Sequence, residues 1–302
     1  MNVFVAGGSG AIGIPLVRAL VRAGHQVTAL TRTAGKQEEL RALGATPAVA
    51  DALNRDALIT AVATARSTHV IHQLTALPKD GPRKAGDLEA TNRLRIDGTR
   101  NLIDAAVHAG ARRFLVGSFA PLSPRSPVDA ATELAAAAAI RSMESQTLQA
   151  SKDGRIEGVV LRYGLFYGLE AASTVKMIEL VRKRRLPVIR GDAGQLPLIH
   201  VDDAVGATIC ALDRAPAGSV YDIVDDRAVS MTEIVDALAR YTGSPMPFRV
   251  PAWLPRLLAP YMSRMTSLRM PLSNARAKAE LGWRPVFPTM NDGLAAMFPH
   301  AA

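Results

Sequence analysis

The stretch Gly7-Gly8-Ser9-Gly10-Ala11-Ile12-Gly13 decides the fold of this chain. It follows an apolar run of strand length at residues 3–6 and leads into residues 12–23, whose apolar side chains recur at helical spacing. Its glycines fit G-x-G-x-x-G, in which they allow a tight turn, a close approach of the backbone to a pyrophosphate, and close packing of helix and strand. The N–H groups and partial positive charge of a helix N-terminus suit phosphate. The pattern therefore predicts a dinucleotide site that includes Gly7, Gly10, Ala11, Ile12 and Gly13.

Strand-like and helix-like segments alternate on both sides of this loop. Apolar strands are predicted at residues 3–6, 27–30, 46–50, 69–72, 114–116 and 159–161. Helices are predicted at residues 12–23, 38–43, 55–65, 87–109 and 132–150. Strands that are apolar throughout and separated by helices indicate a parallel sheet covered on both faces. We therefore predict the α/β class: a Rossmann-type doubly wound parallel sheet at 1–168, and a smaller C-terminal substrate lobe at 169–302 with some segments returning to the first domain.

The end of the second predicted strand indicates which dinucleotide is bound. An acidic residue at this point would hold the ribose 2′-hydroxyl of NAD, whereas an arginine favours the 2′-phosphate of NADP. The chain has Thr31-Arg32-Thr33 and no acid. A guanidinium can bind phosphate through two hydrogen bonds, so the sequence predicts NADP(H) with Arg32 at the phosphate.

The composition excludes several other classes of protein. Of the 302 residues, 48% are hydrophobic and 21% charged, which is typical of a globular chain. Cys210 is the only cysteine, so neither an intrachain disulfide nor a cysteine-rich zinc site is possible, and no His, Asp or Glu set has metal-ligand spacing. No apolar run approaches the roughly 18 residues of a membrane span, and no signal peptide is evident. We expect a cytoplasmic protein without membrane contact and without a metal.

The net charge of +9 is concentrated in the second half of the chain. Residues 176–190 hold six basic residues and one acid, or +5, and residues 249–284 hold seven and one, or +6. A nucleic-acid surface would combine such charge with aromatic side chains or a binding motif, and neither is present. We predict no nucleic-acid partner. Solvated basic surface and attraction of an anionic substrate both remain open for these clusters.

Seven segments, in the right order along the chain, resemble the extended short-chain dehydrogenase/reductase family, the NAD-dependent epimerase/dehydratase group. They are the glycine-rich loop, Asp51 with Leu53, His72-Gln73-Leu74, Asn92 with residues 98–102, and residues 161–168, 198–203 and 281–285. The resemblance implies that Asp51 and Leu53 lie near the adenine and that Gln73, Leu74 and Asn92 line the cofactor. It also implies that Ser118 and Tyr163 lie by the nicotinamide, and that a homodimer forms through the helices at 87–109 and 132–150.

The catalytic residues depart from the pattern of this family. Members typically use a Ser or Thr, and a Tyr and a Lys four residues apart on one helix. Glu144 resembles the acid that follows that pair, which puts the Tyr position at Ala136 and the Lys position at Ile140. The Ser/Thr position falls on Phe119. No Tyr-x-x-x-Lys occurs anywhere in the chain, so the resemblance is to an atypical member.

The replacements for the missing pair are few. Tyr163 and Ser118 are the candidates for polarising a substrate oxygen, while His72 at a strand end is more simply explained as a structural residue. The leading hypothesis is an NADP(H)-dependent reductase of a small, largely apolar carbonyl or enone-like metabolite. Two alternatives use the same scaffold: a redox-silent NADP(H) sensor, and a redox-neutral isomerase or cyclase.

Overall fold

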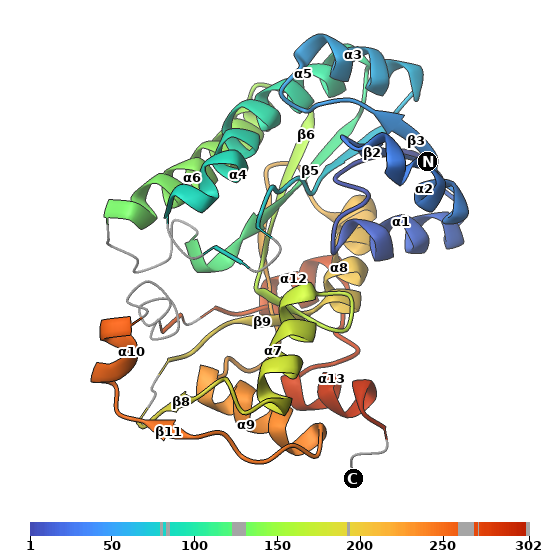
Figure 1. The fold of residues 1–302 in the computed structure, drawn as a ribbon. Helices are drawn as coiled ribbons and strands as arrows, with labels where there is room; N and C mark the ends of the chain where they lie inside the picture. Colours follow the sequence, from blue (N-terminus) through green and yellow to red (C-terminus); the bar gives the residue numbers. More distant parts are fainter. Residues whose placement is uncertain are drawn as a thin grey trace.

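The computed structural model describes residues 1–78, 81–82, 85–122, 131–191, 194–258, 269–270 and 272–299. Its centre is a seven-stranded parallel sheet in the order β10-β6-β5-β4-β1-β2-β3 (Figure 1). The strands are β1 (Asn2–Ala6), β2 (Gln26–Thr31), β3 (Thr46–Val49), β4 (His69–His72), β5 (Arg113–Phe119), β6 (Glu157–Tyr163) and β10 (Val220–Ile223). The order of the strands reverses between β1 and β4, which is the switch point of a doubly wound sheet. The predicted Rossmann-type architecture is confirmed.

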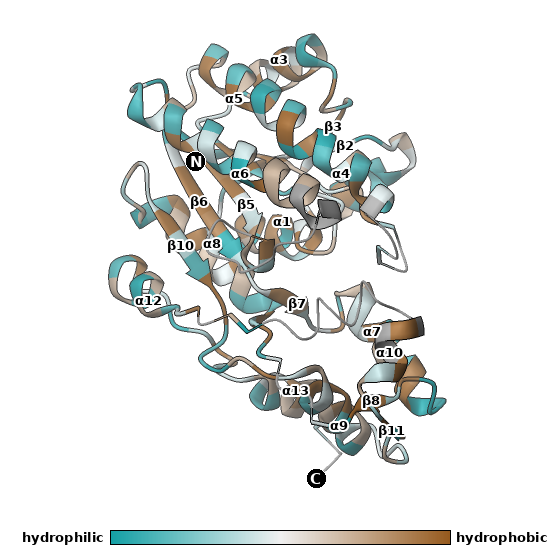
Figure 2. Cartoon of the chain, turned by 90° about the vertical axis from the view of Figure 1, so that its left-hand side faces the viewer, coloured by the Kyte–Doolittle hydropathy of each residue, from teal (hydrophilic) through white to brown (hydrophobic). Residues whose placement is uncertain are grey.

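Helices cover both faces of the sheet, as the apolar strands require. One face carries α1 (Gly13–Arg22), α8 (Val201–Arg214) and α12 (Ala275–Leu281), which share a buried apolar cluster with the strands. The other face carries α3 (Arg55–Thr64), α5 (Thr99–His108) and α6 (Ala131–Lys152) (Figure 1). The short helix α2 (Gln37–Ala42) joins β2 to β3. Strand β6 is largely hydrophobic in the view of Figure 2, as expected for a strand between two helical layers.

The helical segment predicted at 87–109 contains a local irregularity. It begins as the 3₁₀ turn η2 (Ala85–Leu88) and α4 (Glu89–Arg93), and passes through the π-helical turn η3 (Leu94–Gly98) into α5. A π turn inserts one extra residue and rotates the side chains that follow it. The sequence periodicity did not show this turn, because an inserted residue changes only one repeat of an otherwise helical pattern.

The second half of the chain divides between the sheet and a lobe. Strand β10 pairs with β6, and α8 packs against α1, so two of its segments lie on the central sheet. The lobe is built from β7 (Leu165–Tyr167), α7 (Ala172–Arg182), β8 (Val188–Ile189), β9 (Leu198–His200), α9 (Met231–Tyr241), β11 (Arg249–Val250), α10 (Trp253–Leu258) and α13 (Met290–Met297). It has an apolar core of its own, formed mainly by α7, α9 and α13. Within the described ranges, no helix is long and apolar enough to cross a membrane.

Candidate active site at the carboxyl edge of the sheet

The sequence-predicted site residues lie along one edge of the sheet. Because the strands are parallel, their carboxyl ends meet at this edge, where α/β sheets bind ligands. From the β3 side to the β6 side, the residues at or just after the strand ends are Asp51, Arg32, Gly7, Gln73, Ser118 and Tyr163. Positions more than a hundred residues apart in the chain are thus aligned in the order in which an extended dinucleotide would meet them.

The glycine-rich loop at the end of β1 has no room for a side chain at Gly7 or Gly13. A Cβ on Gly13 would lie 2.0 Å from the Gly7 carbonyl oxygen, and one on Gly7, whose φ is +93°, would lie 2.7 Å from the Gln73 carbonyl oxygen. The Gly10 N–H donates to the Gly7 carbonyl at 3.0 Å, which closes the turn. No side chain caps the N-terminus of α1, and the Ile14 N–H donates to the Gly10 carbonyl at 3.1 Å. This cradle fits the pyrophosphate of a dinucleotide.

Hydrogen bonds shape the loops that follow β2 and β3. The Thr31 hydroxyl accepts the Thr33 N–H at 3.2 Å and shapes the turn in which Arg32 is exposed. Among the described residues Arg32 has no ion-pair partner, so its guanidinium is available to a ligand. The Asp51 carboxylate accepts the Leu53 N–H at 2.9 Å and holds the loop after β3. Farther along the edge, the Asn92 side chain accepts a hydrogen bond from Arg95 at 3.3 Å.

The Tyr163 hydroxyl is buried and its proton has a defined partner. It lies 2.7 Å from the Thr208 hydroxyl, and the Gln73 amide donates to it at 3.0 Å. Thr208 donates its own proton to the Ala204 carbonyl at 2.7 Å, so it must accept from Tyr163. Burial raises the pKa of Tyr163 to about 12. The Tyr163 proton therefore points to α8, and the phenol stays neutral at physiological pH.

Ser118 belongs to a buried ion-pair network below the same edge. Its hydroxyl donates to Glu144 at 2.6 Å, and Arg162 holds both oxygens of that carboxylate at 2.9 and 2.7 Å. Glu144 is 3% exposed and Arg162 7%. In the sequence, Glu144 served only as the reference for counting back to the Tyr and Lys positions. Its pairing with Arg162 of β6 depends on the tertiary fold.

Both ring nitrogens of His72, at the end of β4, form hydrogen bonds. Its Nδ1 accepts the Leu74 N–H at 3.1 Å, which leaves the proton on Nε2 to be donated to the Thr99 hydroxyl at 3.0 Å. Burial lowers the pKa of His72 to about 4, so the ring is neutral. These contacts support the structural role expected from the sequence.

The positions expected to carry a Tyr and a Lys lie in an apolar cluster. Ala136 and Ile140 on α6 are 1% and 0% exposed and pack with Leu88, Leu122 and the ring of Phe119. The cluster occupies the end of β5 and the facing turn of α6. The two positions at which the sequence analysis expects the Tyr and the Lys are therefore buried and apolar.

Comparisons with known proteins identify the family of this chain. The model of the NAD dependent epimerase/dehydratase family matches residues 3–224. The chain belongs to this family. It is 38% identical to the 3-diazoavenalumate denitrifying reductase of a Streptomyces species over 97% of this chain and 99% of that one. It is 27% identical to the ceramide reductase of Caulobacter vibrioides, over 98% and 90%.

Solved structures show the same fold. The UDP-glucose 4-epimerase of Thermus thermophilus, in complex with NAD, superposes with a TM-score of 0.78 at 23% identity, covering 100% of this chain and 99% of that one. At this identity the likeness concerns the fold alone. This family member therefore shares the architecture of the epimerases.

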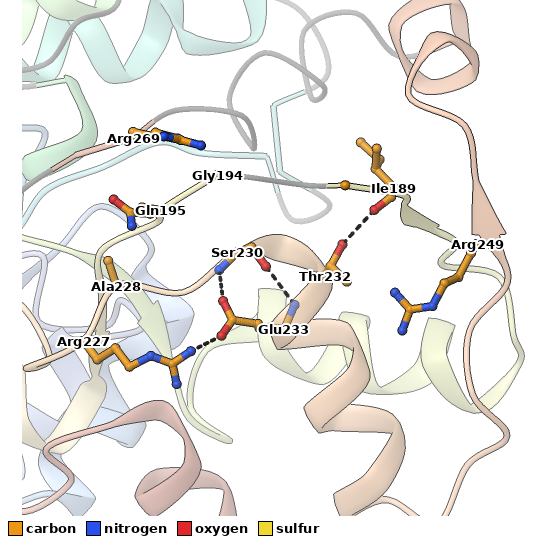
Figure 3. Close-up of a pocket in the computed structure, with 11 residues that line it drawn as sticks. Ile189, Gly194, Gln195, Arg227, Ala228, Ser230, Thr232, Glu233, Arg249 and Arg269 are labelled. Carbon is orange, nitrogen blue, oxygen red and sulfur yellow. Dashed lines mark hydrogen bonds and ion pairs between the residues drawn. The ribbon is translucent and has the colours of Figure 1, made fainter.

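The lobe of this family member contains a polar pocket of about 540 Å³ at the N-terminal end of α9 (Figure 3). Glu233 closes a capping box with Ser230 and also pairs with Arg227, while Arg249 pairs with Asp236 at 2.7 Å. The pocket is lined by Ile189, Gly191, Gly194, Gln195, Arg227, Ala228, Ser230, Thr232, Glu233, Arg249 and Arg269. No group of three or more His, Cys, Asp or Glu in the described part of the chain could hold a metal ion.

A buried carboxyl group joins the sheet to the lobe, and the sequence analysis did not identify it. Asp225, just after β10, is 5% exposed and near Tyr167 and Asp203. Burial, with the charge of Asp203, raises the pKa of Asp225 to about 8. In the sequence, two adjacent aspartates after a strand are typical of an exposed turn. Only the closing of the lobe over this turn buries the first of the two.

We expect Asp225→Asn to stabilise the protein increasingly as pH rises. Because the folded pKa is above the unfolded one, the native state binds the proton more tightly, so wild-type stability falls between about pH 4 and 8. The gain of the Asn variant over wild type should grow by about 2–4 kcal/mol from pH 5 to 8, measured by urea denaturation. Asp226→Asn is the control. Hydrogen bonds from Asn274 and Lys278 outweigh its partial burial and lower the pKa of Asp226, so its removal should destabilise at neutral pH. A pH-independent gain for Asp225→Asn would contradict the expectation.

Proposed function

We propose that this protein is an NADP(H)-dependent oxidoreductase that reduces a small, largely apolar metabolite with a carbonyl, enone-like or similarly electrophilic carbon. The observation that carries the proposal is the side-chain-free glycine cradle at the end of β1, in a chain similar over nearly its whole length to proteins named reductases. When bound, the dihydronicotinamide supplies a hydride. The partly buried ring of Phe119 beside its expected position suits an apolar substrate.

The residues of the edge have distinct roles in this proposal. The N-terminus of α1 holds the pyrophosphate, Arg32 the 2′-phosphate, and the loop of Asp51 and Leu53 the adenine. Gln73, Leu74, Asn92 and Tyr163 line the cofactor. Tyr163 and Ser118 are the predicted catalytic groups, but their protons are donated to Thr208 and Glu144. Their contacts support a positioning role, in which they fix the ends of β5 and β6 below the nicotinamide.

Arg32→Ala should separate NADPH from NADH. Loss of a charge-assisted contact with the 2′-phosphate should weaken NADPH binding by roughly 10- to 100-fold and leave NADH nearly unchanged. Calorimetric titration of both dinucleotides measures the difference. Arg41→Ala, on α2 and paired with Glu38, is a matched control and should bind NADPH like wild type. Equal affinity of the wild type for NADH and NADPH would contradict the assignment of Arg32 to the 2′-phosphate.

The general test is consumption of NADPH against a panel of ketones, enones and other electrophiles. The apolar replacement of Tyr and Lys favours a second candidate, a redox-silent NADP(H)-binding protein. Tight NADPH binding without consumption by any member of the panel would support that second candidate. A homodimer through α5 and α6 and a cytoplasmic location belong to the same proposal, and sedimentation equilibrium tests the former.

A further inference from the structure

The apolar cluster changes which reductions the site can promote. Ala136 and Ile140 stand at the positions where the family resemblance expects the proton-donating Tyr and its Lys, and both are almost fully buried. They contact Leu88, Leu122 and Phe119 rather than solvent or a polar group. The lost pair therefore has not been replaced by another acid at the same place on α6.

The other proton donors near the strand ends already donate hydrogen bonds to groups of the protein. Ser118 donates to a carboxylate that is itself held by an arginine, and Tyr163 donates to Thr208. His72 is neutral and donates to Thr99. For any of them to protonate a substrate, a buried hydrogen bond must first break, which leaves its acceptor unsatisfied at a cost of about 1–3 kcal/mol. In the described part of this edge, Ser118, Tyr163 and His72 thus all donate their protons within the protein and not toward a substrate.

Substrates differ in how much they need an enzyme acid. A ketone that accepts a hydride becomes an alkoxide and must gain a proton, which a positioned acid accelerates. An arenediazonium ion needs none. The ring carbon that bears the nitrogen accepts the hydride and its electron pair as a new C–H bond, and the C–N bond breaks with its pair leaving in dinitrogen. The negative charge of the hydride cancels the positive charge of the diazonium, so the products are neutral without any proton.

Resting on the proposed NADP(H)-dependent hydride transfer, we infer that this site reduces an arenediazonium group to C–H with release of dinitrogen. The reductant is NADPH, which is oxidised to NADP⁺. Phe119, which is only partly buried, presents an aromatic ring against which a flat aryl ring can pack. The Streptomyces protein that is 38% identical over almost the full length is named a denitrifying reductase of a diazo compound, in accord with this chemistry.

The test uses three probes with the same aryl ring: 4-methoxybenzenediazonium, 4-methoxyacetophenone and 4-methoxybenzalacetone. The protein is incubated with each probe and with NADPH deuterated at C4, beside enzyme-free controls. We expect one dinitrogen and one anisole for each NADPH oxidised, with deuterium at the ring carbon that carried nitrogen. The diazonium rate should exceed the ketone rate by at least roughly 100-fold, and it should be flat between pH 5.5 and 7.5 because no acid titrates in the step.

A binding measurement tests the site independently of turnover. 4-Methoxybenzonitrile is linear and isoelectronic with the diazonium probe but does not react. Its affinity for the NADP⁺ complex should fall about tenfold in Phe119→Ser. Phe248→Ser, at a 57% exposed position in the lobe, loses the same side chain and should bind like wild type. Unchanged affinity in Phe119→Ser would remove the apolar cluster from the proposed substrate site.

The outcomes separate this inference from the proposed function. Failure to bind NADPH would overturn both. NADPH binding with turnover of the ketone or enone, but without dinitrogen release, would overturn the diazonium inference alone. Deuterium drawn from D₂O instead of from NADPH would show a protonation or radical route and would also overturn it.

Discussion

Gly13→Ala should abolish dinucleotide binding. A Cβ at this position would lie 2.0 Å from the Gly7 carbonyl oxygen and 2.8 Å from the Gly8 carbonyl carbon, distances that no side-chain rearrangement can relieve. The turn must open, and the N–H groups of α1 then lose their place beside the pyrophosphate. We expect NADPH affinity to fall by roughly 100-fold or more, about 2.7 kcal/mol, in a calorimetric titration.

Gly206→Ala is the matched control for this variant. Gly206 lies in α8, and a Cβ there meets the Trp283 ring at 3.7 Å, an ordinary contact. Since Ala is the better helix former, Gly206→Ala should fold at least as well as wild type and bind NADPH with unchanged affinity. If Gly13→Ala retained wild-type affinity, the glycine-rich loop would not be the pyrophosphate site.

Arg162→Met should cost about 3–5 kcal/mol of unfolding free energy, because it leaves the Glu144 carboxylate buried without its cation. Both side chains are more than nine-tenths buried, so water cannot compensate. Urea denaturation monitored by fluorescence and by circular dichroism measures the loss. Arg100→Met is the control, since its partner Asp97 and Arg100 itself are exposed, and it should cost less than about 1 kcal/mol.

A double variant isolates the charge from the packing. Arg162→Met with Glu144→Leu replaces the ion pair by apolar side chains, and such replacements are often neutral. The double variant should therefore recover at least half of the loss, although Ser118 no longer has its acceptor. Additive losses in the two single variants would contradict the interpretation that the unpaired charge carries the cost.

The fold and the cofactor edge could be predicted from the sequence because their signals are local. The loop from Gly7 to Gly13 lies within one strand–turn–helix unit, and helical or strand periodicity marks each neighbouring element in a few residues. Parallel strands then place Arg32, Gln73, Ser118 and Tyr163 at one edge by topology alone. The same locality explains the one miss in this half, the π turn at Leu94–Gly98, where a single inserted residue hardly alters the pattern.

What only the tertiary structure decided is where the protons lie. The sequence shows that Tyr163 and Ser118 carry hydroxyl groups, but the acceptors of their protons, Thr208 and Glu144, come from helices 45 and 26 residues away. The raised pKa of Asp225 likewise depends on the lobe that covers it. Burial and hydrogen-bond direction are properties of contacts between distant segments. The sequence therefore determined the Rossmann scaffold and the residues that follow its strands, and the three-dimensional packing determined which groups accept the protons of Tyr163 and Ser118.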